Sequence, residues 1–163
     1  ETGVTNLKIE KFDLCKLIRE LVDSFEIKMK EKGIEITYEF GKNKSIFINA
    51  DNFRITQVMS NLIVNSLNYG VENGTIEIVT KNLSKEKILV RVIDNGQGIP
   101  EDDLPRIFER FYRVDKTRNR QEGGSGLGLA IVKHIVEAHN EIVYVESSLN
   151  VGSEFSFTLT KSN

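Results

Sequence analysis

The sequence predicts an α+β fold, a two-layer α/β sandwich with about three helices on one face of a mixed, mostly antiparallel sheet. Three observations lead to this class. Some segments repeat their apolar residues at helical spacing, and others alternate as strands do. The strand segments mostly follow one another directly, without the regular strand–helix alternation that is typical of parallel sheets. The 163 residues suit one domain, and no repeat or low-complexity tract divides them.

The first predicted helix covers residues 14–29, where apolar side chains recur every three or four positions. Asp13 is a suitable N-cap for this helix and Gly33 a suitable C-cap. Two short strands are predicted next, at 34–40 and 45–49, because apolar and polar side chains alternate in the first and a second short apolar segment follows.

A second predicted helix begins after the cap residue Asp51, runs to about Tyr69 and stops at Gly70. The rest of the chain continues with strands and shorter helices, separated by turn-forming residues. We expect strands at 75–80, 87–93, 142–147 and 154–160, helices at 102–112 and 127–138, and a polar loop at 113–124.

The composition excludes several classes of protein. With 22 basic and 24 acidic residues, the net charge of −2 argues against a generally basic nucleic-acid binder. The one cysteine, Cys15, has no partner for an internal disulfide. His134 and His139 lie five residues apart, which matches neither the HExxH zinc motif nor its inverted form. No apolar run approaches the ~18 residues of a membrane span, so we expect no direct membrane insertion.

One face of the second helix carries a continuous polar stripe. A solvated face is the simplest explanation, but asparagine is a poor helix former and a solvated face favours Glu, Lys or Gln. Asparagine oxygens are also hard neutral ligands that suit Mg²⁺. The stripe is therefore either a solvated face or a candidate metal site. Its residues are Arg54, Gln57, Asn61, Asn65, Asn68 and Glu72.

Asp94 follows the predicted strand 87–93 and has the same parity as Val90 and Val92. Its carboxylate should therefore point toward the core, where a charge needs hydrogen-bond donors. The glycine-containing turn 95–98 is either a simple hairpin turn or a place where the backbone approaches a ligand closely.

Residues 123–129, Gly-Gly-Ser-Gly-Leu-Gly-Leu, lead directly into the last predicted helix. Backbone N–H groups at such an entry can cradle phosphate, and a flexible hinge with close helix packing is the alternative. The segment matches neither the Walker loop nor the Rossmann pattern. The preceding residues 113–122 carry a net charge of +2, which suits closure over a polyphosphate.

Together, five segments resemble the motifs of the catalytic, ATP-binding domain of bacterial sensor histidine kinases, within the superfamily of DNA gyrase, the heat-shock chaperone ATPases and the MutL repair proteins. One such motif is a weak signal, whereas five in the family's order, over essentially the whole chain, are specific. The resemblance implies a Bergerat-type ATP-binding fold. The segments are Asn61–Asn65 with Tyr69 (N box), Asp94–Pro100 (first glycine box), Phe108–Arg113 (F box), Gly124–Leu129 (second glycine box) and Gly152–Phe155 (last glycine box).

The resemblance also implies ATP and Mg²⁺ as cofactors and a role for each matching residue. Asn65 would hold Mg²⁺, with Asn61 beside it near the phosphates. Asp94 would accept a hydrogen bond from the adenine amino group, and Arg113 would reach the γ-phosphate. Phe108 and Phe111 would anchor the loop that follows them and face a partner domain. Further nucleotide contacts are implied for Tyr69, Gly96, Gly98, Ile99, Lys116, Gly124, Gly126, Leu127 and Gly128.

Three positions qualify the resemblance. Asn61 stands where the gyrase-like members carry a glutamate that activates water, and asparagine cannot act as that base, which favours transfer to another acceptor over ATP hydrolysis. Asn68 replaces a lysine of many members, so one phosphate contact is missing. Either Lys116 or Arg118 substitutes for it, or the nucleotide binds more weakly. The sequence 139–141, His-Asn-Glu, replaces a common His-Gly-Gly, which we expect to affect only the turn.

Neither His134 nor His139 is followed by the acidic residue that follows the phosphoacceptor histidine in this family. We therefore expect a catalytic domain at 13–163, preceded at 1–12 by the end of a linker from a separate dimerisation and phosphoacceptor domain. The resemblance implies this domain and a response regulator receiver domain as partners, no nucleic acid, and a cytoplasmic location within a membrane-anchored sensor.

The expected function is transfer of the ATP γ-phosphate to a histidine of that dimerisation domain. Two alternatives remain open at this point. A degenerate nucleotide-binding or docking module is favoured by Asn68, and a serine kinase of the anti-sigma type shares the same motifs. The linker-like N-terminus and the F box favour the histidine kinase.

Overall fold

The computed structural model describes residues 6–113 and 126–163, and in these ranges seven strands form one sheet. The sheet order is β1-β3-β7-β5-β4-β2, and β6 also pairs with β7. Only β2 and β4 pair in parallel among the described strands. The strands are β1 (Ile9–Asp13), β2 (Glu35–Glu39), β3 (Phe47–Asp51), β4 (Thr75–Asn82), β5 (Lys87–Asp94), β6 (Val143–Ser148) and β7 (Gly152–Lys161).

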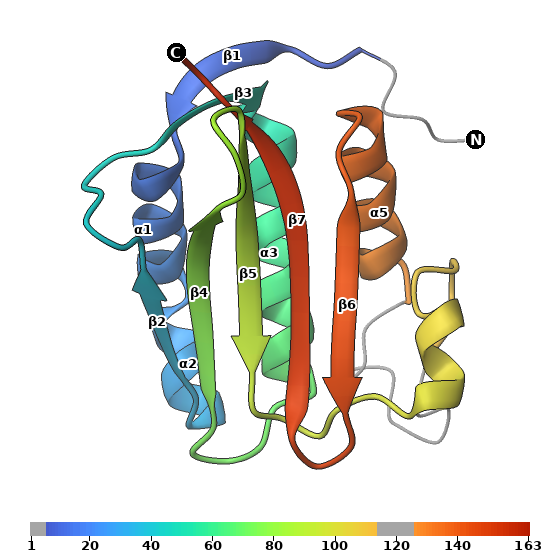
Figure 1. Ribbon diagram of the computed structural model, residues 1–163. Coiled ribbons are helices and arrows are strands. Elements are labelled where there is room, and N and C mark those ends of the chain that lie inside the picture. The colour runs from blue at the N-terminus through green and yellow to red at the C-terminus, as the bar shows by residue number, and fades with distance from the viewer. Residues whose placement is uncertain (1–5, 114–125) are drawn as a thin grey trace.

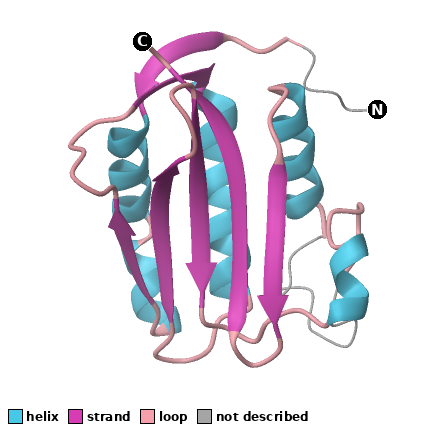
Figure 2. Ribbon diagram, in the orientation of Figure 1, coloured by secondary structure: helices cyan, strands magenta, loops and turns pink. Residues whose placement is uncertain are grey.

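The helices cover one face of this sheet, as Figure 1 and Figure 2 show. The arrangement confirms the predicted two-layer α+β fold with a mostly antiparallel sheet. In the described part of the chain the helices are α1 (Leu14–Ser24), α2 (Glu26–Lys32), α3 (Asn52–Asn68), α5 (Gly128–Ala138) and a 3₁₀ helix, η1 (Glu101–Arg106).

Three predicted helix caps are confirmed. The Asp13 carboxylate accepts the Cys15 N–H at 3.0 Å before α1, and the Asp51 carboxylate accepts the Arg54 N–H at 3.1 Å before α3. Gly33 ends α2 in the left-handed conformation with φ +66°. These contacts satisfy backbone groups that the helix ends would otherwise leave without partners.

Three local predictions are wrong. The single helix expected at 14–29 is divided at Phe25, whose N–H donates to the carbonyl of Val22 in a 3₁₀-type bond. The helix expected at 102–112 is the short 3₁₀ helix η1, and it contains Pro105, which lacks the N–H that an α-helix needs. Strand β1 was not expected, because residues up to 12 were interpreted as the end of a linker and Asp13 as a helix cap.

The core lies between the sheet and the helices. Phe155 and Phe157 of β7 are completely buried, as are Met59, Leu62 and Ile63 of α3. In β7 these apolar side chains alternate with Ser156, Thr158 and Thr160. This alternation fixes which side chains of the central strands reach the helical layer, where the candidate site lies.

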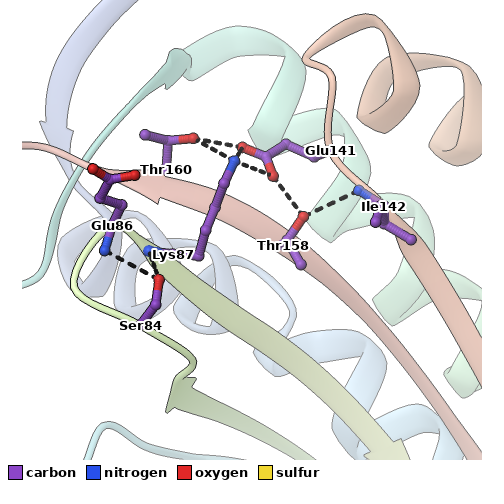
Figure 3. A network of polar contacts seen from close by, with 7 residues as sticks. All are labelled: Ser84, Glu86, Lys87, Glu141, Ile142, Thr158 and Thr160. Carbon is purple, nitrogen blue, oxygen red and sulfur yellow. Dashed lines mark hydrogen bonds and ion pairs between the residues drawn. The ribbon is translucent and has the colours of Figure 1, made fainter.

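A buried carboxylate joins the sheet to the end of α5 (Figure 3). Both oxygens of Glu141 accept from Lys87 Nζ at 2.9 Å, and the hydroxyls of Thr158 and Thr160 donate to the same carboxylate at 2.5 and 2.7 Å. The Glu141 side chain is 5% exposed and that of Lys87 40%. The sequence 139–141 therefore does more than form a turn, because Glu141 ties the α5–β6 connection to β5 and β7.

Candidate functional site

A pocket of about 250 Å³ opens between α3, the end of β5, the segment after η1 and the start of α5. Residues of the sheet and of α3 form one wall of the pocket. Residues that precede position 114 or follow position 125 form the other wall. Most of the residues predicted for the site line this one pocket. They are Asn61, Asn65, Tyr69, Asp94, Gly98, Ile99, Arg113, Gly126 and Gly128.

The polar stripe of α3 is divided between the pocket and the surroundings. Asn61, Asn65 and Asn68 line the pocket. Arg54 and Gln57, one to two turns earlier, do not, and they hydrogen-bond to each other at 3.2 Å. The asparagines thus lie where a ligand could reach them, as the poor helix propensity of the stripe indicated.

Asn61 fixes the start of α5. Its Nδ2 donates to the carbonyl of Gly128 at 3.2 Å, so its Oδ1 is not used in this contact and can still accept. Both Asn61 and Asn65 offer neutral amide oxygens. Mg²⁺ is commonly held by one or two protein oxygens together with waters and substrate phosphates, so this donor set fits the ion.

Asp94 points into the helical layer, as its parity predicts, and lines the pocket. Its Oδ1 accepts from the N–H of Gly96 at 2.9 Å and of Ser153 at 3.3 Å, and its Oδ2 accepts from the Ser66 hydroxyl at 3.0 Å. Burial raises the pKa of Asp94, and these three donors act in the opposite direction. The site therefore holds a desolvated carboxylate in a fixed orientation.

The turn after Asp94 packs against the β6–β7 connection. The Asn150 N–H donates to the carbonyl of Gln97 at 2.7 Å, and the Ile99 N–H donates to Ser147 Oγ at 2.7 Å. Gly98 has φ +77°, and a Cβ there would lie 2.2 Å from the Ser148 carbonyl oxygen. Gly98 is thus required by close backbone contact inside the protein as well as by its place in the pocket wall.

Phe111, which follows η1, is hydrogen-bonded to Gly126, which precedes α5. The Phe111 N–H donates to the Gly126 carbonyl at 2.8 Å, and Phe111 itself has φ +64°. A Cβ on Gly126 would lie 2.7 Å from Phe111 Cα, so glycine is needed at this contact. Phe108 packs edge-on against Phe155, with ring centroids 6.2 Å apart, whereas Phe111 is 67% exposed.

Of the other four predicted residues, two do not line the pocket and two lie outside the described residues. Gly96 contacts the site only by donating its N–H to Asp94, and a Cβ there would lie 2.6 Å from the Tyr69 carbonyl oxygen. Leu127 precedes α5 as its N-cap. Lys116 and Gly124 lie outside the described residues.

Two serines that support Asp94 had no predicted role. Ser66 was assigned to the buried face of the α3 segment, and Ser153 lies at the start of β7. A serine among the apolar residues of a buried helix face is a usable signal, because a buried hydroxyl needs a partner. The N–H of Ser153 carries no such signal, since any non-proline residue would supply it.

The described residues contain no group of three His, Cys, Asp or Glu side chains that could hold a metal ion. Within the same ranges, none of the helices has both the length and the apolar character needed to cross a bilayer.

The pocket of this two-layer fold combines asparagines on a helix, a buried aspartate and glycines at the start of another helix. This combination is typical of one class of ATPase domain. The chain belongs to the family of histidine kinase-, DNA gyrase B- and HSP90-like ATPases, whose family model matches residues 50–163.

Within this family the similar proteins are sensor histidine kinases. Over 151 residues, the chain is 36% identical to sensor histidine kinase WalK of Bacillus subtilis and 38% identical to sensor protein kinase WalK of Staphylococcus aureus. Each match covers 92% of this chain, but 24% and 36% of the relatives. The chain thus spans about a quarter to a third of the length of these relatives.

Solved structures agree with this classification. The catalytic domain of histidine kinase ThkA superimposes with a TM-score of 0.81 at 32% identity, covering 95% of this chain and 97% of that one. Full-length ShkA in complex with AMPPNP gives a TM-score of 0.83 at 29% identity, covering 96% of this chain and 32% of that one. The described fold is therefore that of a histidine kinase catalytic domain.

Proposed function

We propose that this domain binds ATP with Mg²⁺ and transfers the γ-phosphate to a histidine on a separate dimerisation domain of the same kinase. The observation that carries the proposal is the shared pocket, in which an oriented buried carboxylate, Asp94, lies with two asparagines, Asn61 and Asn65. A group that can recognise the base and groups that can hold the phosphates and their metal ion thus line the same cavity. The similarity to ShkA, which was solved with AMPPNP, supports nucleotide as the ligand.

In this proposal Asp94 accepts a hydrogen bond from the adenine amino group, while Tyr69 and Ile99 contact the nucleotide near the base. Asn65 holds Mg²⁺ through its amide oxygen, and Asn61 lies beside it. Bound Mg²⁺ supplies charge neutralisation for the phosphates during transfer.

Arg113 reaches toward the γ-phosphate, since it lines the pocket at the edge of the gap. Gly126 and Gly128 bring backbone close to the phosphate side. Phosphate contacts are also proposed for Lys116 and Gly124, which lie outside the described residues. Asn61 cannot activate water, so the domain positions the phosphate and stabilises its charge while the acceptor brings its own base.

We further propose that the residues before β1 continue from a linker that leaves the dimerisation helices, and that a response regulator receives the phosphate afterwards. ThkA, solved in complex with the response regulator protein TrrA, superimposes with a TM-score of 0.78 at 30% identity and supports this partner class. The location that fits such a kinase is cytoplasmic, in a membrane-anchored sensor, without nucleic acid as a partner.

The test mixes this domain with the dimerisation domain of the same kinase and ATP labelled at the γ-phosphate. We expect labelled dimerisation domain whose label is lost in acid, as phosphohistidine is, and retained in base. Asn65→Ala should abolish labelling, while the exposed Asn49→Ala on β3 serves as the matched control. Acid-stable label would indicate the serine kinase, and no label at all would indicate the degenerate nucleotide-binding or docking module.

A further inference from the structure

Ser66 lies directly behind the carboxylate of Asp94. It belongs to α3, is 1% exposed and does not line the pocket, and its Oγ donates to Asp94 Oδ2 at 3.0 Å. One side of the Asp94 carboxylate therefore faces the pocket, and the other side contacts buried protein atoms. Among the described residues, the Ser66 hydroxyl is the one side-chain donor to this carboxylate.

The acceptor capacity of the carboxylate is almost filled by the protein. An ionised carboxylate has about four acceptor positions, two on each oxygen. Backbone N–H groups of Gly96 and Ser153 occupy both positions of Oδ1, at 2.9 and 3.3 Å. Ser66 occupies one position of Oδ2. One acceptor position remains, and it is on the oxygen that Ser66 holds.

We propose that Ser66 is the positioning residue for base recognition: it fixes Asp94 Oδ2 so that its last acceptor position receives one N–H of a 6-aminopurine. This inference rests on the proposed ATP binding. A 6-oxopurine would present an acceptor to the same oxygen, and a site built to receive a donor rejects a ligand that lacks it. Ser66 thereby contributes to the choice of adenine over guanine without touching the nucleotide.

The hydroxyl acts in two ways that an alanine could not replace. It holds the side-chain plane of Asp94 from the second oxygen, since both backbone donors bind the first. It also favours the charged form, against the burial that raises the pKa of this carboxyl. Without Ser66, Oδ2 would be free to turn away, and the carboxyl would bind a proton more readily.

The experiment compares two nucleotides on the same protein. Wild type and Ser66→Ala are titrated calorimetrically with ATP and with purine riboside triphosphate, which lacks the 6-amino group. A hydrogen bond to a charged group corresponds to about a tenfold change in affinity. We expect Ser66→Ala to weaken ATP by about this factor and the analogue by less than about twofold.

The matched control is Ser156→Ala, which removes another buried serine hydroxyl, on β7. It should leave both affinities unchanged. Ser66→Cys keeps the shape of the side chain, with a somewhat larger atom and a weaker donor, and should give an intermediate loss of ATP affinity. Thermal unfolding of each variant reports whether the fold is intact, and alanine should be tolerated because it is the better helix former.

An equal loss for both nucleotides would mean that Ser66 only supports the fold and would overturn the inference. Unchanged ATP affinity in Ser66→Ala would overturn it as well. Failure of the proposed function has a different signature, because wild type would then bind neither nucleotide or would not prefer ATP over the analogue.

Discussion

Asp94→Asn replaces one oxygen of the pocket by an NH₂ group and leaves the size of the side chain unchanged. The amide oxygen can keep the N–H bonds from Gly96 and Ser153, and the NH₂ group can donate to Ser66 Oγ, which is able to accept. Every protein contact of Asp94 therefore has a replacement, although the Ser66 hydroxyl changes from donor to acceptor. Only the acceptor position that faces the ligand is lost, and a second N–H of the amide now lies there.

The magnitude follows from this count. A hydrogen bond to a charged group contributes about 1.5–3 kcal/mol, equivalent to roughly 10–150-fold in affinity. Two opposed N–H donors add to that loss, so ATP affinity should fall by about 100-fold or more. The free energy of unfolding should change by only about 1 kcal/mol, because each contact to Asp94 has a replacement and only the Ser66 O–H loses its acceptor.

Stability has a pH dependence of definite sign at this residue. Burial raises the pKa of Asp94 above its ordinary value of 3.8, so the folded state binds this proton more tightly than the unfolded state does. Ionisation of Asp94 thus lowers stability as the pH rises from 3.8 through the raised pKa. Asp94→Asn lacks this effect, and its unfolding free energy relative to wild type should increase over the same interval.

The assay is calorimetric titration with ATP and GTP, paired with urea unfolding at several pH values. The exposed Asp23→Asn on α1 is the control for a change of charge alone. In Asp94→Asn the affinity for GTP should increase relative to that for ATP, because the 6-oxo group of guanine can accept a hydrogen bond from the new amide. A folded Asp94→Asn variant that binds ATP as wild type does would refute the role of Asp94 and the reasoning from acceptor positions.

Three further variants test other parts of the structure. Glu141→Gln should lower the free energy of unfolding by about 1–3 kcal/mol, and adding Lys87→Met should recover part of that loss, as a double-mutant cycle in urea would show. Gly98→Ala should destabilise by more than about 1 kcal/mol, because its φ is +77° and the new Cβ would lie 2.2 Å from the Ser148 carbonyl oxygen; an unchanged melting temperature would contradict this. Asp51→Ala should cost about 1–2 kcal/mol by removing the cap of α3, measurable by thermal unfolding with the exposed Asp102→Ala as reference.

The sequence was most informative where one residue broke a local rule. Asp94 placed a charge at a core-facing strand position, and the structure confirms that it points inward and is met by donors. Asparagines at pocket-facing positions of α3 broke the preference of a solvated helix. Such conflicts between local preference and position are visible in the chain because functional sites often violate the rules that the rest of a domain follows.

Long-range contacts account for what the sequence did not predict. Strand β1 is defined by its pairing with β3, some forty residues later, and five residues have little pattern of their own. The apolar spacing of residues 14–29 continues through Phe25, so it could not show where the helix divides. Glu141 looked like a turn residue, because its partners on β5 and β7 are distant along the chain.

The central place of β7 bears on the order in which the domain can be built during synthesis. β7 pairs with β5 and β6, and its last residues pair with β3, as Ile48 opposite Lys161 shows. Until residues 152–161 leave the ribosome, β3 and β5 each have an unpaired edge, and such edges favour association between chains. A nascent chain stopped before Gly152 should therefore remain open to protease, and one extended past Lys161 should become resistant in a single step.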